Sequence, residues 1–494
     1  MSQTLPELFA TRAPDPSRPF LHKARGGIGR YLDLEMEVSR WAGGLVAAGV
    51  GRGDRVVYQV EKSPAVLTLH LALLRCGAVQ VPVHPAYADS EVAALLVDAD
   101  PVLVIRDPAR VVLPGEWQSL TLDASGNGSA CELASDADIA MPTLDSADGA
   151  ALLYTSGTTG RPKGALLTHS NLVCNAKTLV DAWGFSTEDV LLHILPLFHT
   201  HGLFVATHCV LASGASMVFL PAFDVSQILA ELPRCSVLMG VPTHYSRLLA
   251  DHRFNASRVR GMRLFVSGSA PMPPALHSAF EAQTGRTVLE RYGMTETSML
   301  TSNPLDGVRK PGSVGPPLPG VAVRVVNDEE TPMVTGSVGH VQVRGPNVFG
   351  GYWRRPDLAD ETFTDDGWFR TGDLGAFDSD GYLELVGRSK DLVISGGLNV
   401  YPRDVEDVLD ALVGVQESAV FGIPDRDLGE RVVAVVVADD GVALDPETLR
   451  AASREQLAGY QVPKKIVIVE SLPRNAMGKV EKGNLREAAR GWMT

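Results

Sequence analysis

The sequence is poor in cysteine, in positive charge and in long hydrophobic runs. Its five cysteines are widely spaced and include no C-x-x-C pair, which indicates reduced, mostly packed thiols rather than a disulfide framework. Lys and Arg number 44 against 58 Asp and Glu, a formal net charge of −14. This balance argues against a general nucleic-acid-binding protein, which needs a basic face.

No stretch approaches the roughly 18 uncharged apolar residues of a membrane-spanning helix, and the longest candidate, 66–74, is interrupted by His70. The N-terminus has neither a basic n-region nor an apolar h-region, so secretion is not supported. The fairly basic stretch 11–25 leaves organelle targeting open as an alternative. We therefore expect a soluble, cytoplasmic protein with no membrane and no nucleic-acid partner. The sequence leaves open a monomer or a homodimer.

What is present is typical of a globular protein. Hydrophobic residues make up 45% and charged residues 21%, so a sizeable core is expected and wholesale disorder is not. The 48 glycines and 32 prolines favour short elements joined by many turns over a helical bundle. A length of 494 residues suggests about three core-sized units.

The order of hydrophobic segments predicts an α/β fold with a separate C-terminal domain. Helix-like segments alternate with apolar runs through 31–112 and again up to about residue 301, which indicates βαβ units and largely parallel sheets. Residues 114–148 are small and polar, as in an exposed connection. Short strands with frequent glycine in 315–387 predict a smaller all-β unit, and residues 390–494 predict a separate α+β domain.

A glycine-rich loop follows the apolar strand predicted at 150–154. It reads Thr155-Ser-Gly-Thr-Thr-Gly-Arg-Pro-Lys-Gly. Its glycines allow backbone amides to converge, its hydroxyls add donors and Lys163 adds a compact positive charge, which together suit a polyphosphate. The spacing from Gly157 to Lys163 differs from the P-loop, and Gly164 replaces the hydroxyl that would bind Mg²⁺. Taken alone, the loop is equally compatible with a flexible surface segment.

Five motifs together resemble the adenylate-forming superfamily of acyl-CoA synthetases, adenylation domains and luciferases. They occur in the family's order and spacing over nearly the whole chain: the loop at Thr155, Tyr292-Gly-Met-Thr-Glu296, Trp368-Phe-Arg-Thr-Gly-Asp373, Gly387-Arg-Ser-Lys-Asp391 and Pro473-Arg-Asn-Ala-Met-Gly-Lys479. Within the superfamily, the stretches 195–206, 237–249 and 264–302 are most similar to malonyl-CoA synthetases. The resemblance implies an N-terminal AMP-binding domain at 1–389, made of two related sheet-and-helix subdomains and a β unit, and a mobile α+β lid at 390–494.

The resemblance also implies the nucleotide site. The glycine-rich loop would grip the β- and γ-phosphates of ATP, Tyr292 would stack on adenine, and Asp373 would accept the ribose hydroxyls with help from Arg388. Glu296 would help to hold Mg²⁺, and Thr295 would contact the α-phosphate. The predicted nucleotide-binding residues are Thr155, Ser156, Gly157, Thr158, Thr159, Gly160, Lys163, Ser269, Ala270, Pro271, Tyr292, Gly293, Asp373 and Arg388.

Lys479 matches the lysine that bridges the acid carboxylate and the α-phosphate during adenylation, although a lone lysine is more often a solvated surface residue. Lys479, Glu296 and Thr295 form the predicted catalytic set. In the superfamily the C-terminal domain rotates between two half-reactions about the position of Lys390. Ser395, Gly396 and Gly397 would then line the channel for coenzyme A.

Four histidines, His193, His199, His201 and His208, invite a metal interpretation, since His199 and His201 are expected on one face of a strand. Because no cysteine or close carboxylate completes a ligand set, the sequence does not favour a metal site there. The resemblance instead places His199 by the acyl pocket and His201 on the substrate side.

Arg291 departs from the broad superfamily, where the residue before the motif tyrosine is commonly small. An arginine beside the adenylation centre is costly unless it meets an anion, and a dicarboxylic acid supplies a second carboxylate. Arg247, expected at the start of a helix, is the second candidate, and Ser267 and Met294 complete the predicted acid-binding set. The alternative that Arg291 pairs with Glu290 or another surface acid stays open.

The sequence thus predicts an ATP- and Mg²⁺-dependent ligase that joins malonate to coenzyme A through an acyl-adenylate with release of AMP and pyrophosphate, and it leaves open whether methylmalonate is also a substrate. Two enzyme alternatives remain: a synthetase for another short or aromatic acid, and an adenylation enzyme that loads a carrier protein. A catalytically inactive scaffold would be expected to have lost Lys479, Glu296 or the phosphate loop, and all three are present.

Overall fold

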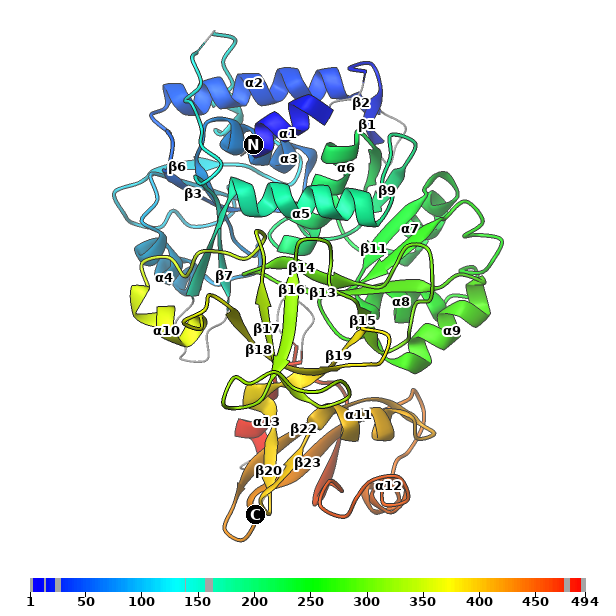
Figure 1. The fold of residues 1–494 in the computed structure, drawn as a ribbon. Helices are drawn as coiled ribbons and strands as arrows, with labels where there is room; N and C mark the ends of the chain where they lie inside the picture. The colour runs from blue at the N-terminus through cyan, green and yellow to red at the C-terminus, as the bar shows by residue number, and fades with distance from the viewer. Residues whose placement is uncertain are drawn as a thin grey trace.

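A computed structural model describes residues 3–12, 15–22, 28–137, 139–155, 163–474 and 480–489. Within these ranges the chain forms four sheets, two large and two small (Figure 1). The two large sheets and one small sheet lie in the N-terminal region, and the other small sheet lies in the C-terminal region. This arrangement confirms the predicted α/β fold with a smaller α+β domain at its end.

The first large sheet has six strands in the order β6-β5-β3-β4-β7-β8. The strands are β3 (Arg55–Gln59), β4 (Val79–Pro82), β5 (Leu103–Arg106), β6 (Gln118–Thr121), β7 (Gly149–Thr155) and β8 (Lys163–Thr168). All neighbours are parallel except β7 and β8, which are antiparallel. Helices α3 (Pro64–Arg75) and α4 (Asp89–Ala99) connect the parallel strands, as the alternating pattern predicts.

Strand β6 lies within the segment that the sequence predicts to be an exposed connection, so that prediction was incomplete. Its side chains are exposed or half-buried, and it pairs in parallel with β5 alone, at the edge of the sheet. An edge strand buries little apolar surface and is often polar. Its hydrophobic pattern is therefore too weak to reveal it.

The second large sheet has eight strands in the order β14-β13-β12-β11-β9-β10-β1-β2. They are β1 (Pro19–His22), β2 (Ile28–Arg30), β9 (Val190–His193), β10 (Ser216–Phe219), β11 (Val237–Gly240), β12 (Leu264–Ser267), β13 (Val288–Met294) and β14 (Ser298–Ser302). The central strands are parallel, and the pairs β1–β2 and β13–β14 are antiparallel. Both large sheets thus have a parallel centre, with an antiparallel pair at one edge of the first sheet and at both edges of the second.

Helices cover the large sheets and connect their strands. Besides α3 and α4 they are α1 (Leu5–Arg12), α2 (Tyr31–Ala47), α5 (His169–Ala182), α6 (Thr207–Ser213), α7 (Val225–Glu231), α8 (Pro242–Leu249) and α9 (Pro274–Thr284). Helix α5 starts directly after β8, where the Thr168 side chain accepts a hydrogen bond from the Asn171 amide. It contacts α1, α6 and β14, so it ties the first sheet to the second (Figure 1).

The small N-terminal sheet is entirely antiparallel, in the order β15-β19-β18-β17-β16. Its strands are β15 (Ser313–Gly315), β16 (Ala322–Val326), β17 (Gly339–Arg344), β18 (Phe369–Phe377) and β19 (Leu383–Arg388). The short helix α10 (Ala359–Thr362) precedes β18. This sheet is the all-β unit that the glycine-rich pattern predicts.

The C-terminal domain forms the lower lobe of Figure 1. Its sheet runs β21-β20-β23-β22, with β24 beside β23. The strands are β20 (Val393–Ser395), β21 (Leu398–Val400), β22 (Val415–Asp425), β23 (Gly429–Ala438) and β24 (Lys465–Val469), and the helices are α11 (Pro402–Asp410), α12 (Pro446–Ser453) and α13 (Lys482–Ala489). The boundary proposed at residues 389 and 390 falls in the short 3₁₀ helix η5 (Ser389–Asp391) between β19 and β20.

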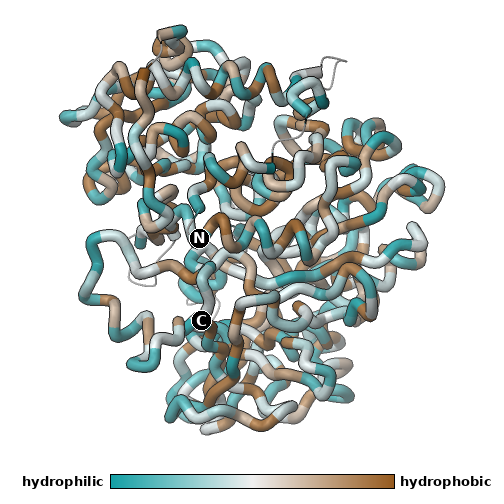
Figure 2. Tube along the Cα trace, turned by 45° about the horizontal axis from the view of Figure 1, so that its top comes forward, coloured by the Kyte–Doolittle hydropathy of each residue, from teal (hydrophilic) through white to brown (hydrophobic). Residues whose placement is uncertain are grey.

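Each lobe has hydrophobic clusters of its own. Two clusters contain only residues from Val393 onward, and a large cluster joins residues from Leu5 to Leu383. In Figure 2 hydrophobic segments run through the interior of the fold, while many outer loops are hydrophilic. In the described part of the chain, no helix combines the length and the apolar character needed to cross a membrane.

A buried carboxylate joins three strands of the second sheet at their amino-terminal ends. Asp189, just before β9, accepts hydrogen bonds from Arg263 Nε at 2.7 Å and Ser236 Oγ at 2.7 Å, which precede β12 and β11. Arg263 Nη2 completes a bidentate pair at 2.8 Å. The Asp189 side chain is 4% exposed, so the arginine compensates a charge with little access to water.

We predict that Arg263→Ala lowers the free energy of unfolding by about 3 kcal/mol, because it leaves the Asp189 carboxylate buried without its cation. Urea denaturation measures this loss. Arg253→Ala is the matched control, since its pair with Asp251 is more exposed and should contribute little. Equal denaturation midpoints for the two variants would contradict the prediction.

Candidate active site

The candidate site lies where the parallel strands of the second sheet end. His193, Gly240 and Ser267 are the last residues of β9, β11 and β12, and Arg291 lies in the neighbouring strand β13. Ligands of open α/β sheets bind beyond these carboxyl ends. The antiparallel β unit supplies further site residues from β18 and β19.

Arg291 is the most unusual residue of the site. Its side chain is buried, with 4% of the residue exposed, and its guanidinium lies against the backbone of Gly268. A Cβ atom on Gly268 would lie 2.4 Å from Arg291 Cζ, so only glycine leaves room for the guanidinium. Burial lowers the pKa of Arg291 to about 9. Among the described residues, no hydrogen-bond partner meets its Nε or Nη2 atoms.

The structure does not support the alternative in which Arg291 pairs with Glu290. Glu290 instead accepts hydrogen bonds from the backbone amides of Met272 at 3.0 Å and Gly312 at 3.3 Å. Successive side chains of a strand point to opposite faces, so these neighbours are directed apart. No acid in the described ranges forms an ion pair with Arg291, and the guanidinium remains available to an anionic ligand.

His201 lies near Arg291 but not on a strand, so the prediction that His199 and His201 share one face of a strand was wrong. His201 begins the buried π-helix η2 (His201–Ala206), and half-buried His199 lies in the turn before it. His201 Nδ1 is 3.3 Å from Ser269 Oγ, and within the described chain its Nε2 has no partner. Burial, and then the charge of Arg291, hold the pKa of His201 well below its ordinary value.

Two other predicted acid-binding residues are less favourably placed. Arg247 lies in the last turn of α8, not at the start of a helix as predicted, and it is exposed, with its Cζ 6.0 Å from the centre of the Phe223 ring. Ser267 is fully buried, and its hydroxyl has no partner among the described residues. It pairs in register with Glu290, so strand alternation directs it away from the side occupied by Arg291.

The β13–β14 hairpin brings the motif residues Tyr292 to Glu296 to the site. Gly293 is required by a close approach, since a Cβ there would lie 2.0 Å from the carbonyl oxygen of Ser298. Met294 and Thr295 are half-buried near the turn. On the adjacent loop, Ser269 has a left-handed backbone with φ +69°, while Ala270 and Pro271 are exposed. The hairpin and this loop flank the position of Arg291.

Tyr292, Asp373 and Arg388 are brought together from three strands. The Tyr292 hydroxyl donates a hydrogen bond to Asp373 Oδ2, and Arg388 Nε lies 2.7 Å from Asp373 Oδ1. Asp373 and Arg388 are register partners on β18 and β19. Burial, and then the charge of Asp373, raise the pKa of Tyr292 well above its ordinary value. The three residues form one connected group at an edge of the site, and their roles toward adenine and ribose stay predictions.

Glu296 stands beside a tyrosine that the sequence analysis missed. Tyr352 donates a hydrogen bond to Glu296 Oε1 at 2.9 Å, and Lys163 Nζ lies 5.5 Å from the centre of the Tyr352 ring. Burial raises the pKa of Glu296. A buried carboxylate with a neighbouring lysine suits a hard cation shared with phosphate oxygens, so this donor set fits Mg²⁺. Tyr352 follows two glycines, but no motif marked it.

Several predicted residues lie outside the described ranges. They are Ser156, Gly157, Thr158, Thr159, Gly160 and Lys479. Thr155 and Lys163 flank this part of the glycine-rich loop as register partners on β7 and β8, and the Thr155 hydroxyl is 3.4 Å from the Lys163 carbonyl oxygen. The roles of the loop and of Lys479 stay predictions.

The predicted channel residues form a tight turn in the C-terminal domain. Gly396 and Gly397 connect β20 to β21 with φ of +60° and +78°, values that favour glycine. Ser395 is buried, and Lys390, in η5, is exposed. The roles of these residues toward coenzyme A and in domain movement stay predictions.

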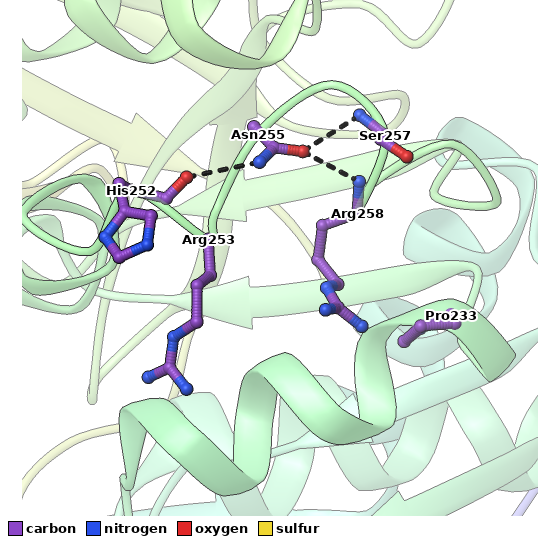
Figure 3. Close-up of a pocket in the computed structure, with 6 residues that line it drawn as sticks. All are labelled: Pro233, His252, Arg253, Asn255, Ser257 and Arg258. Atoms are coloured by element: carbon purple, nitrogen blue, oxygen red, sulfur yellow. Dashed lines mark hydrogen bonds between the residues drawn. The ribbon is translucent and has the colours of Figure 1, made fainter.

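A separate surface hollow of about 430 Å³ carries none of these residues. Figure 3 shows its lining: Pro233, His252, Arg253, Asn255, Ser257 and Arg258. On one side of the hollow, Asn255 donates a hydrogen bond to the His252 carbonyl oxygen at 3.1 Å and accepts hydrogen bonds from the amides of Ser257 and Arg258 at 3.2 Å. Arg253 forms an ion pair with Asp251 at 2.6 Å. The unpartnered buried groups, and not this hollow, mark the candidate site.

We predict that Glu290→Gln changes how stability depends on pH. Burial raises the pKa of the Glu290 carboxyl from 4.5 to about 7, so the folded protein keeps this proton to a higher pH than the unfolded chain does. Its contribution to stability is thus present below pH 4.5 and lost as the pH rises through about 7.

The glutamine variant lacks this loss, so its unfolding free energy relative to the unaltered protein should rise by up to about 3 kcal/mol across that pH range. Urea denaturation at a series of pH values measures the difference. Stability curves that stay parallel would show that Glu290 does not titrate in this range.

Comparisons with known proteins agree with this geometry. The profile of the AMP-binding enzyme family matches residues 9–353, and that of the AMP-binding enzyme C-terminal domain matches residues 404–479. A mitochondrial malonate–CoA ligase of Xenopus laevis is 38% identical over 476 residues, covering 87% of this chain and 82% of the relative. A sulfoacetate–CoA ligase of Cupriavidus necator is 36% identical over 494 residues, covering 97% and 96%.

A solved structure gives the same result for the whole fold. The crystal structure of ATP-bound MatB from Rhodopseudomonas palustris has a TM-score of 0.95 at 46% identity and covers 100% of both chains. These likenesses confirm the resemblance carried by the five motifs. The chain belongs to the AMP-binding enzyme family, within the adenylate-forming superfamily.

Proposed function

We propose that this protein, an adenylate-forming acid–CoA ligase, activates malonate with ATP and transfers the malonyl group to coenzyme A. The first half-reaction would form malonyl-AMP and release pyrophosphate, and the second would form malonyl-CoA and release AMP. The observation that carries the choice of acid is the buried Arg291 guanidinium without an acidic partner in the described chain. The similar malonate–CoA ligases support it.

Arg291 would bind the carboxylate of malonate that does not react. A guanidinium held in a dry site recovers its lost hydration when it meets a carboxylate in a bidentate pair. Burial disfavours the charged form of Arg291, which is why its pKa falls to about 9, and a bound carboxylate would offset this cost. His201, with an unpartnered Nε2 within the described chain, would donate or accept one further hydrogen bond.

The remaining residues would serve the nucleotide. Tyr292 would pack on adenine and Asp373, oriented by Arg388, would accept the ribose hydroxyls. Lys163 and the glycine-rich loop would hold the phosphates, and Glu296 would hold Mg²⁺, which neutralises the triphosphate when bound. Lys479 would neutralise charge as the acid attacks the α-phosphate. Positioning and electrostatics of this kind account for most of such a transfer.

Sulfoacetate is a second candidate acid, because it also carries an anionic group one carbon away from its carboxylate and a similar ligase acts on it. The same guanidinium would serve a sulfonate. Acetate and hexanoate lack a second anion and would leave Arg291 unpaired. The acid profile is therefore the sharpest test of the proposal.

Purified protein should release pyrophosphate with ATP, Mg²⁺ and malonate, and form malonyl-CoA when coenzyme A is added. Methylmalonate, sulfoacetate, acetate and hexanoate are compared under the same conditions, and mass spectrometry identifies each thioester. A preference for acetate or hexanoate would contradict the dicarboxylate assignment. Absence of acid-dependent pyrophosphate release would contradict adenylation itself.

We predict that Arg291→Ala lowers kcat/KM for malonate by about 100-fold or more, because it leaves a carboxylate buried without its cation. Arg247→Ala, a change at an exposed arginine, is the matched control and should have a smaller effect. The KM for ATP should stay near that of the unaltered enzyme in both variants. A larger loss of kcat/KM for malonate in Arg247→Ala than in Arg291→Ala would indicate that Arg247, on α8, binds the acid instead.

A further inference from the structure

Lys62 is a second buried basic side chain, at the contact between the two large sheets, and burial holds its pKa well below the ordinary value. It lies in the connection between β3 and α3 and is 9% exposed. Its Nζ is 3.0 Å from His193 Nδ1 and 2.8 Å from the His193 carbonyl oxygen, and it lies 4.4 Å from the centre of the Phe219 ring. No carboxylate in the described ranges pairs with it. A buried lysine without an acid needs another reason to be held there.

The contacts of His193 settle which of its ring nitrogens carries the proton. Its Nε2 faces the Gly202 carbonyl oxygen at 3.1 Å, which only accepts hydrogen bonds, so Nε2 must carry hydrogen. Burial, and then the charge of Lys62, hold the pKa of His193 well below its ordinary value, so the ring is neutral. Nδ1 then carries no hydrogen, and its lone pair accepts a hydrogen bond from Lys62.

The Gly202 carbonyl connects the contacts of Lys62 and His193 to the candidate site. It lies in the first turn of the π-helix η2 and accepts from His193 Nε2, from the Thr207 hydroxyl at 2.9 Å and from the Thr207 amide. A Cβ on Gly202 would lie 1.9 Å from the Pro196 carbonyl oxygen, so the helix is pressed against the preceding segment. π-Helical turns are costly and are frequent at functional sites.

The same turn carries His201, the residue before Gly202. His201 Nδ1 lies 3.3 Å from Ser269 Oγ, and the charge of Arg291 acts on its ring. A contact that fixes the Gly202 carbonyl therefore fixes the histidine next to it. The path from Lys62 to Arg291 consists of the Lys62–His193 and His193–Gly202 hydrogen bonds, the peptide bond from Gly202 to His201, and the electrostatic interaction of His201 with Arg291.

We propose that Lys62 is a positioning residue for the acid-binding pocket, which holds His193 in the tautomer that anchors Gly202 and so keeps His201 beside Arg291. The effect on activity rests on the proposed function, because it presumes that the acid binds at Arg291. The contact between Lys62 and His193 does not depend on that function. Lys62 acts on the acid side of the site and not on the nucleotide side.

The test measures the KM for the acid and for ATP in Lys62→Met, with Lys177→Met on α5 as the matched control. The acid is the one that the unaltered enzyme activates best. We expect Lys62→Met to raise the KM for the acid about tenfold, the size of one lost charged hydrogen bond, and to leave the KM for ATP unchanged. Equal effects on both KM values, or no effect on either, would overturn the proposal.

Two substitutions of His193 separate positioning from general damage. His193→Gln keeps a donor that can reach Gly202, whereas His193→Asn keeps an acceptor for Lys62 and loses that reach. The glutamine variant should retain the low KM for the acid and the asparagine variant should lose it. The reverse order would overturn the path through Gly202. Thermal midpoints of all variants show which of them remain folded.

A spectroscopic measurement distinguishes failure of this proposal from failure of the proposed function. In protein with ¹⁵N-labelled histidine, the His193 signal, assigned with His193→Gln, should show a protonated Nε2 and an unprotonated Nδ1. Lys62→Met should shift it toward a mixture of tautomers. An unchanged His193 signal in Lys62→Met would overturn the proposal, even if no acid is activated.

Discussion

A guanidinium buried away from any acid of the described chain is the constraint on which the rest of the candidate site depends. Taking a charge out of water is unfavourable, and the cost is tolerated in a stable fold only where a partner compensates it. Gly268 leaves room for the Arg291 guanidinium, and the adjacent Glu290 is bonded to backbone amides instead. The candidate site is therefore organised around a buried cation, and the rest of the fold must supply the stability that its burial costs.

A compensated charge pair lies at the opposite, amino-terminal ends of the strands of the second sheet. Asp189 and Arg263 join the strands at their amino-terminal ends with a compensated, hydrogen-bonded charge pair. Arg291, on the neighbouring strand β13, lies toward the carboxyl ends, and no acid of the described residues pairs with it. The parallel strands thus separate the compensated charge pair from the uncompensated Arg291, which lies toward the end of the sheet where ligands of such folds bind.

The fold could be predicted from the sequence wherever an element is buried on both sides. Strand β12, for example, is an apolar run, because burial leaves little room for polar residues. Strand β6 could not be predicted because it is an exposed edge. Helix α8 was expected from its Gly-Val-Pro start, but Arg247 lies at its end, since the proline sets the first turn five residues earlier.

The candidate site was predictable by residue type and less so by geometry. Arg291 was identified because it departs from the usual small residue, yet only the strand shows that Glu290 points away from it. The π-helix at His201 has no sequence pattern of its own, because its wide turn depends on contacts with His193 and Thr207. Tyr352 was missed for a similar reason: its role comes from a hydrogen bond to Glu296 across the fold.

The hydrogen-bonded pairing of Asp373 with Arg388 has a mechanical consequence. Arg388 ends β19, and the chain enters η5 at the next residue before it reaches the C-terminal domain. Asp373, which is proposed to accept the ribose hydroxyls, is thus linked to the start of the second domain through its ion pair with Arg388 and a very short stretch of backbone. A change of ligand at Asp373 would be transmitted directly to the orientation of the chain where the second domain begins.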